Sequence, residues 1–393
     1  MSELLESRWV DTKNALLEGL QGNKKSVMAA TLENTRRYLS ESATAGATSA
    51  GNVATLNRVI LPVIRRVMPT VIANELVGVQ PMTGPVGQIH TLRVRYSDTQ
   101  NATGTVNDTT AGEEALSPFK IAEAYSGDGT AGKAANTATL EGAAGNRMSI
   151  QILKQTVEAK TRKLSARWTF EAAQDAQSMH GIDVEAEIMA ALAQEITAEI
   201  DQEVIGSLVT LSGTAAQTYD QAAVSGTATF VGDEHAALAV QINRVSNLIA
   251  QRTRRGAGNW AVVSPLALTI LQSATTSAFA RTTEGTFEAP TNTKMVGTLN
   301  NAMKVYVNTY AADTAPVLIG YKGASESDAA AFYCPYIPLM SSGVVLDPGT
   351  FEPTVSFMTR YGYVELNNTA SSLGNAADYL GRVEITDGNV SFS

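Results

Sequence analysis

Residues of the kinds that carry out chemistry are few and scattered in this chain. His90, His180 and His235 are its histidines, and none stands in an HExxH pattern or beside a Cys/Asp/Glu set at metal-ligand spacing. The single cysteine, Cys334, has no base next to it in sequence, so it fits a small buried hydrophobic residue better than a nucleophile. One cysteine also excludes an internal disulfide. We therefore predict no enzymatic activity, no metal site and no cofactor.

Two further patterns could bind phosphate. Gly84 and Gly87 are too few for a loop that cradles phosphate, and no GxxxxGKS or GxxxxGKT motif is present. The run Arg252-Thr253-Arg254-Arg255 could contact a nucleic-acid backbone, but cations at the end of a predicted helix also complement the helix dipole. The formal net charge of −9 argues against wholesale phosphate binding. We therefore favour the helix-end interpretation and predict no sequence-specific DNA binding.

An acidic stretch is the clearest pattern among the charged residues. No Lys or Arg occurs between Arg167 and Arg244, whereas acids recur throughout this interval. Glu195, Glu199 and Glu203 follow one another at i,i+4 spacing, so a helix places these like charges on one side and loses roughly 0.2–0.5 kcal/mol per pair. A solvated acidic face is one explanation.

The alternative explanation is that cations from another segment or from a neighbouring copy contact this acidic face. The candidates are Lys160, Arg162, Lys163 and Arg167, which lie just upstream, and Arg65 and Arg66 near the N-terminus. We expect the four upstream cations and Glu195, Glu199 and Glu203 to form contacts between subunits on assembly.

The low content of charge suggests that other copies of the chain cover much of its surface. Of the 393 residues, 44% are hydrophobic, which is enough for two or three lobes with their own cores, but only 17% are charged. Charge keeps free monomers soluble, so this surface suits self-association, although an ordinary weakly charged domain is the plainer alternative. The start lacks signal-peptide features, and no apolar run reaches the ~20 residues that span a bilayer. We expect a chain made in a reducing cytoplasm and without membrane contact.

Predicted helices and strands are interleaved without a βαβ period, which is typical of the α+β class. The strongest helix spans 183–208, with Asp183 as its cap and apolar residues at every fourth position. Further helices are predicted over 233–255 and from Ser264-Pro265 onward. Strands are predicted at 260–263, 303–308 and 316–321.

The N-terminal third predicts an arm followed by a long β-hairpin. Residues 1–45 have helical apolar spacing and end in a linker of small residues, so we expect an arm tethered to the body. Strand patterns flank residues 97–147, which are rich in Gly, Thr, Ala and Asn. A hairpin with so polar a tip has too little apolar surface for a core of its own and must pack against other protein. We therefore expect its large residues Phe119 and Tyr125 to contact a neighbouring copy. Beyond residue 161 the apolar parity shifts by one, which indicates a bulge or bend.

Several short stretches of the chain form a pattern through their number, order and spacing, which covers most of 58–365. The stretches are Met68-Pro69, ELVGVQPMTGP at 75–85, KTRKL at 160–164, AQD at 173–175, HGIDVEAE at 180–187, VGTLN at 296–300, MKVYV at 303–307, GYKG at 320–323, FYCPYIPL at 332–339 and TRYG at 359–362. Together they resemble the major capsid protein family of T-even-type tailed bacteriophages (myoviruses).

The resemblance implies the Hong Kong 97-type capsid fold, with an N-terminal arm, an extended β-hairpin loop, a peripheral domain built on a spine helix, and an axial domain. The expected divisions are the arm 1–57, the first peripheral segment 58–87, the extended loop and its strands 88–170, the spine-helix region 171–208, the axial domain with its return to the peripheral domain 209–365, and the C-terminal segment 366–393.

The resemblance also implies a structural function in the virion. Copies of such proteins assemble, in the host cytoplasm, into hexamers and in some cases pentamers of an icosahedral or prolate shell around the phage DNA. Scaffold, vertex and decoration proteins of the same head are implied partners. Family members are often cut after Leu/Ile-x-Glu by a head protease, and Glu18 and Glu41 fit that short pattern.

Two alternatives remain open on the sequence. One is the paralogous vertex protein, which forms pentamers in this family. The other is a shell protein that crosslinks itself through Lys–Asn isopeptide bonds, with Lys120 and Lys133 of the hairpin as candidates.

Overall fold

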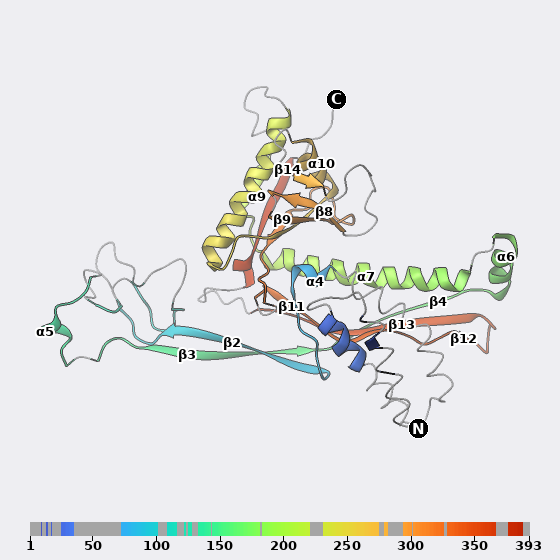
Figure 1. Ribbon diagram of the computed structural model, residues 1–393, viewed down its shortest axis with the longest axis horizontal. Helices are drawn as coiled ribbons and strands as arrows, with labels where there is room; N and C mark the ends of the chain where they lie inside the picture. The colour runs from blue at the N-terminus through green and yellow to red at the C-terminus, as the bar shows by residue number, and fades with distance from the viewer. Residues whose placement is uncertain are drawn as a thin grey trace. The chain divides into compact units, whose positions relative to one another are not determined.

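The protein is described by a computed structural model that divides into two compact units (Figure 1). The described residues are 9, 13–14, 17, 25–34, 72–100, 108–115, 122, 125–127, 133–142, 144–180, 183–220, 231–274, 279–281, 294–300, 302–325, 328–366 and 376–387. The first unit comprises Met1–Gly87, Val157–Gly206 and Phe332–Val364, and the second comprises Gln88–Thr156, Ser207–Ala331 and Glu365–Ser393. Within the described residues, no helix is both long and apolar enough to cross a membrane.

The first unit is built on a five-stranded sheet. Its strand order is β1 (Gly78–Val79), β11 (Ala331–Ser341), β13 (Pro353–Glu365) and β12 (Val345–Leu346), and β4 (Lys160–Arg167) also pairs with β13. β1 runs parallel to β11, whereas β4 and β12 run antiparallel to β13. β11 is buried at almost every position and β13 at every second one, because the first is apolar throughout and the second alternates.

Helices complete the first unit. α4 (Ala73–Leu76) and α6 (Phe170–His180) are short, whereas α7 (Val184–Leu211) is the 28-residue helix that the apolar spacing predicts. The Asp183 carboxylate accepts hydrogen bonds from the Glu185 and Ala186 amides at 3.1 and 3.4 Å, which confirms it as the cap. Ile196, Ile200 and Val204 are buried, so the predicted stripe does face the interior.

The N-terminal segment differs from the expected tethered arm. Residues 25–34 are helical and bury Val27, Met28 and Leu32. The Asn34 side chain donates to the carbonyl oxygens of Met82 at 2.7 Å and of Tyr336 at 3.1 Å. This helix is therefore part of the core of the first unit, because its apolar residues and its polar end both find partners there.

The second unit contains a seven-stranded mixed sheet. Its order is β5 (Gln217–Asp220), β14 (Leu380–Asp387), β10 (Val317–Gly320), β6 (Trp260–Val263), β9 (Met303–Val307), β8 (Lys294–Leu299) and β7 (Phe279–Arg281). The pairs β5–β14 and β6–β9 are parallel and the others antiparallel. α9 (Val231–Thr253), α10 (Pro265–Ser273) and the 3-10 helix η1 (Ala376–Tyr379) accompany it. The α+β class is thereby confirmed.

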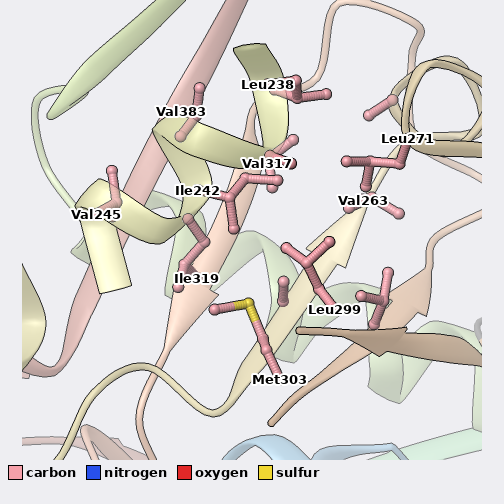
Figure 2. Close-up of a cluster of buried hydrophobic side chains, with 14 of the residues drawn as sticks. Leu238, Ile242, Val245, Val263, Leu271, Leu299, Met303, Val317, Ile319 and Val383 are labelled. Carbon is pink, nitrogen blue, oxygen red and sulfur yellow. The ribbon is translucent and has the colours of Figure 1, made fainter. Parts of the chain in front are cut away.

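One cluster of apolar side chains forms the core of this second unit. Figure 2 shows Leu238, Ile242 and Val245 of α9 beside side chains from the sheet, including Ile319 and Met303. β6 has the predicted bounds, and the Ser264 hydroxyl caps α10 by accepting from the Ala267 amide at 3.2 Å.

The arginine run supports the helix-end interpretation. α9 ends at Thr253, and Arg254 adopts a left-handed backbone with φ of 49°. The Arg255 guanidinium lies 2.6 Å from the Asp328 carboxylate. Arg255 therefore has a carboxylate partner within the chain.

The predicted hairpin is divided into a ribbon and a sheet strand. β2 (Val86–Tyr96) and β3 (Met148–Glu158) form a two-stranded ribbon, whereas β4 leaves it to pair with β13. β3 and β4 are separated at Ala159, and the half-buried positions change from odd numbers up to 159 to even numbers from 162 onward, close to the parity shift predicted beyond residue 161. The structure thus differs from the expected single hairpin over 88–170, because residues 160–167 belong to the sheet of the first unit and not to the ribbon.

The far end of the ribbon has a small core of its own. Tyr96, Ala115 and Tyr125 are buried against one another, and the short helix α5 (Thr137–Leu140) belongs to the same connection. The buried Arg93 guanidinium lies 2.7 Å from the Glu114 carboxylate. These contacts order part of a segment that its composition alone would leave without a core.

We expect Ile242→Ala to lower the free energy of unfolding by about 2–5 kcal/mol, because the fully buried side chain leaves a cavity in the second unit. Val240→Ala is the matched control on the same helix, since Val240 is 66% exposed, and it should change stability by less than about 0.5 kcal/mol. Urea unfolding of the unassembled chain measures both. Equal losses in the two variants would contradict the described packing of α9.

Candidate functional site

The residues that could carry chemistry are not brought together. Burial raises the pKa of the Cys334 thiol to about 11, so the reactive thiolate is disfavoured. His90 is exposed on β2, and His235 is buried on α9. Among the described residues, no group of three His, Cys, Asp or Glu side chains is arranged to hold a metal ion.

The acidic face of α7 is met by a single arginine from the same chain. Arg162 Nη1 lies 2.6 Å from the Glu199 carboxylate, and Arg162 Nη2 lies 2.5 Å from the Glu203 carboxylate. Arg162 Nε also donates to the Tyr361 hydroxyl oxygen at 2.6 Å, and the Tyr361 hydroxyl in turn donates to Glu203. The Arg162 guanidinium thus bridges the two carboxylates, and the Tyr361 hydroxyl contacts both Arg162 and Glu203. We call Arg162, Glu199, Glu203 and Tyr361 the arginine cluster.

Three elements position the arginine cluster. The i,i+4 spacing puts Glu199 and Glu203 on one side of α7. Arg162 lies on the half-buried face of β4, because the parity shifts between residues 159 and 162. β4 lies beside β13 (Figure 1), and the register of this pair places Lys160 opposite Tyr361. The repulsion between the two glutamates is therefore offset only once α7, β4 and β13 have assembled.

The electrostatics of the arginine cluster favour its charged form. Burial alone would raise the pKa of Glu203, but the hydrogen bonds from Tyr361 and Arg162 outweigh it and hold that pKa below its ordinary value. Burial and the neighbouring Glu203 raise the pKa of Tyr361, so its hydroxyl stays protonated and can donate. The side chains of Arg162, Glu199 and Glu203 are 30%, 44% and 39% exposed, so solvent screens these pairs and each contributes modestly.

Of the two sources of cations considered for the acidic face, another segment of the same chain supplies Arg162 to Glu199 and Glu203. The other predicted residues on this side are placed differently. Lys160, Lys163 and Glu195 are exposed, and Arg167 is 72% exposed and 3.6 Å from Glu352. The exposed side chains are therefore the ones still able to reach a neighbouring copy.

Tyr125 is not available as a contact with a neighbour. Its ring is 5% exposed and packs on Tyr96 with centroids 4.5 Å apart, and its hydroxyl donates to the Arg147 carbonyl oxygen. The expectation for Tyr125 is therefore wrong, because its own chain supplies the cover. The other predicted positions on the hairpin and the arms lie outside the described residues: Phe119, Lys120, Arg65, Arg66, Glu18 and Glu41.

One face of the ribbon exposes large apolar side chains. The Ser97 amide donates to the Arg147 carbonyl oxygen and the Ala159 amide donates to the Pro85 carbonyl oxygen, each at 2.9 Å. This register places Leu92 opposite Ile152, on the same face as Met148 and Ile150. The exposed fractions of Leu92, Ile150 and Ile152 are 63%, 67% and 65%, and that of Met148 is 52%.

We call these four residues the apolar ribbon face: Leu92, Met148, Ile150 and Ile152. Sequence reasoning missed it. The signal was the alternation of Met148, Ile150 and Ile152, but alternation alone predicts a face that is buried, and only the register shows that it is open. His90 and Lys154 lie opposite each other next to this face and extend it with polar side chains.

A second exposed apolar region lies on the first unit. The rings of Phe170, at the start of α6, and Phe351, in the turn between β12 and β13, have centroids 6.4 Å apart. Both are exposed, and so are Val345 and Leu346 of β12. Sequence reasoning gave no sign of this region, because its members come from two distant segments.

Comparisons with known proteins agree on one family. A family model described as major capsid protein Gp23 matches residues 53–385. The chain is 30% identical to the major capsid protein of Enterobacteria phage T4, over 86% of this chain and 80% of that protein. It is 29% identical to the major capsid protein of Vibrio phage KVP40, over 84% of this chain and 80% of that protein.

Solved structures are similar to the chain only at low identity and low TM-score. One is the capsid of Myoviridae phage XM1, at 11% identity and a TM-score of 0.43, covering 80% of this chain and 91% of that chain. Another is from Microbacterium phage Oxtober96, at 12% identity and a TM-score of 0.45, covering 80% and 90%. At these TM-scores the structures add nothing to the sequence matches.

We expect Arg162→Ala to lower the free energy of unfolding by about 1–2 kcal/mol, because it leaves Glu199 and Glu203 without their shared partner. Arg167→Ala is the matched control, since this exposed residue of the same strand has a single 3.6 Å contact, and it should stay within about 0.5 kcal/mol. Urea unfolding of the unassembled chain compares them. A neutral Arg162→Ala would contradict the role of the arginine cluster.

The same variant should change the response to acid. The pKa of Glu203 is held below its ordinary value of 4.5, so its contribution to stability is present above that pH and is lost as the pH falls through the folded-state pKa. We therefore expect the wild type to lose stability below about pH 4.5 more steeply than Arg162→Ala does. Unfolding curves at several pH values test this, and parallel losses in both proteins would argue against it.

Proposed function

The chain belongs to the Gp23 family of phage major capsid proteins, and from this we propose how its copies bind one another. As a major capsid protein it is a structural component of the virion shell and not an enzyme. We propose that its copies form hexamers, and pentamers where the shell curves, around the phage DNA. The contact that we assign first is the apolar ribbon face, covered by a neighbouring copy.

The exposure of the apolar ribbon face supports this proposal. Four large apolar side chains that are each more than half exposed stand next to one another on a single face. Soluble monomers rarely display such contiguous patches, and those that exist usually mark sites of association. Burying each side chain is worth about 1.5–3 kcal/mol, so a neighbour that covers the face gains substantially from it.

The architecture of the ribbon points the same way. A two-stranded ribbon is marginally stable in water. Residues 112–115 pair with β2 only at its end, where the Ala115 amide donates to the Val94 carbonyl oxygen and the Tyr96 amide donates to the Glu113 carbonyl oxygen. β2 and β3 are nevertheless 11 residues long each. A cover from another copy would supply the packing that a third strand or a helix gives elsewhere.

A second set of contacts involves exposed charged side chains next to the arginine cluster. We propose that Lys160, Lys163 and Arg167 of β4 and Glu195 of α7 contact neighbouring copies. Their exposure supports this, and so does the opposite sign of the two groups. These contacts would fix orientation more than they add affinity, since exposed pairs are weak.

Other proteins of the head are further proposed partners. Scaffold, vertex and decoration proteins are proposed on account of the family alone. The region of Phe170, Phe351, Val345 and Leu346 is exposed and apolar, and it is the surface that we assign to contacts other than those of the ribbon.

We expect Ile150→Asp to reduce the yield of assembled particles by about tenfold or more, because each contact then loses a buried apolar side chain and gains a charge. The melting temperature of the unassembled chain should not change, since Ile150 is 67% exposed there. Negative-stain microscopy and sedimentation measure the yield.

Ser149→Asp is the matched control. Ser149 is the preceding residue of β3, is also exposed, and points to the opposite face of the ribbon. It introduces the same charge and should assemble with near-normal yield. If Ile150→Asp assembles as well as Ser149→Asp, the apolar ribbon face is not the contact.

A further inference from the structure

A buried histidine joins two helices of the second unit. His235 lies in the first turns of α9 and its side chain is only 3% exposed. Its Nδ1 is 2.5 Å from the hydroxyl oxygen of Ser273, the last residue of α10. The hydrogen bond therefore ties the start of one helix to the end of the other.

The hydrogen bonds of Ser273 assign the proton on the ring. The Ser273 hydroxyl donates to the Ile270 carbonyl oxygen at 3.1 Å, and a hydroxyl has one hydrogen to give. Nδ1 of His235 must then carry the proton and donate to Ser273, which leaves Nε2 as a bare acceptor. Nε2 is buried and has no hydrogen-bond partner among the described residues. The neutral imidazole is therefore the form that fits.

The described residues around His235 provide few charged groups that could stabilise a protonated ring. The elements packed against α9 are α10, β5, β10, β14 and η1. α10 and β10 carry no ionisable side chain. The ionisable residues on the others are Tyr219 and Asp220 of β5, Arg382, Glu384 and Asp387 of β14, and Asp378 and Tyr379 of η1.

Among the described groups, only Glu234, next to the histidine on α9, acts on the ring by its charge. Burial lowers the pKa of His235, and Glu234 offsets part of that effect. Tyr219 is occupied otherwise, since its hydroxyl donates to the Glu234 carbonyl oxygen at 3.2 Å. The N-terminal end of α9 is also the positive end of its dipole, which disfavours a cation there.

We propose that His235 is an acid-sensitive latch between α9 and α10. With a neutral ring, the Nδ1–H bond to Ser273 holds the start of α9 against the end of α10. A proton taken from solvent adds to Nε2 and creates a buried cation whose new N–H has no acceptor among the side chains and backbone groups that the structure describes. Solvating that cation requires the first turns of α9 to separate from α10, so acid opens this corner of the second unit.

The direction of the effect follows from linkage. The pKa of His235 in the folded state lies below its ordinary value of 6.5, so the unfolded chain takes up the proton first as the pH falls. The stability given by the neutral ring is complete above that value and is lost progressively below it. A single group of this kind raises the unfolding equilibrium constant by up to about tenfold per pH unit.

The test replaces His235 by asparagine. His235→Asn keeps an N–H close to the position of Nδ1 and cannot bind a proton at mild acidity. The unfolding equilibrium constant of the full-length unassembled chain is measured between about pH 7.5 and pH 5. We expect the constant of the wild type to rise more steeply, by up to about tenfold per pH unit, than that of the variant. Equal slopes would overturn the proposal.

A matched control and a second readout complete the design. His90→Asn removes an exposed histidine of β2 and should follow the wild-type slope. If His235→Asn does not fold, amide hydrogen exchange of the wild type decides instead. Protection of the first turns of α9, normalised to the intrinsic rate, should fall on acidification, whereas that of the middle of α7 should not. Unchanged protection in α9 would also overturn the latch.

Discussion

One guanidinium that two carboxylates share constrains how three segments of the first unit come together. Arg162 can reach Glu199 and Glu203 together only if the acids are four residues apart on a helix, if β4 has turned its parity, and if β13 supplies Tyr361 at hydrogen-bond distance. Tyr361 in turn packs on Tyr333 of β11, with ring centroids 5.3 Å apart. Three segments that are distant in sequence thus meet at the Arg162 guanidinium. This guanidinium offsets the repulsion between Glu199 and Glu203 on α7.

The sequence predicted the elements whose signals are local. α7 with its Asp183 cap, α10 with Ser264 and Pro265, and the strands β6, β9 and β10 all follow from residues within a few positions of one another. β11 and β13 were not predicted, because β11 is buried along its length and shows no period. Their partners also lie far away in sequence: β4 pairs with β13 across almost two hundred residues of chain.

The predicted contact residues show the same difference between local signals and partners that lie far away in sequence. The absence of Lys and Arg beyond Arg167 correctly directed attention to Arg162, Glu199 and Glu203, but a charge pattern cannot distinguish a partner within the chain from one on a neighbour. Tyr125 failed for a related reason. The cover over its ring comes from Tyr96 and Ala115, and composition does not reveal that pairing. The apolar ribbon face needed the register of β2 and β3, which two hydrogen bonds fix and which no local pattern encodes.

The single residue between β3 and β4 has a mechanical consequence. The chain passes from the ribbon into β4 through Ala159, and β4 is then held by eight consecutive residue pairs with β13. Gly362 of β13 permits close approach at the junction, because a side chain there would come within 2.9 Å of Val157. Hydrogen bonds of an antiparallel pair stand perpendicular to the strands, so a pull along β4 loads all of them in shear at once rather than opening them one by one. The link from the ribbon therefore ends in a strand whose pairs with β13 share any load along that strand.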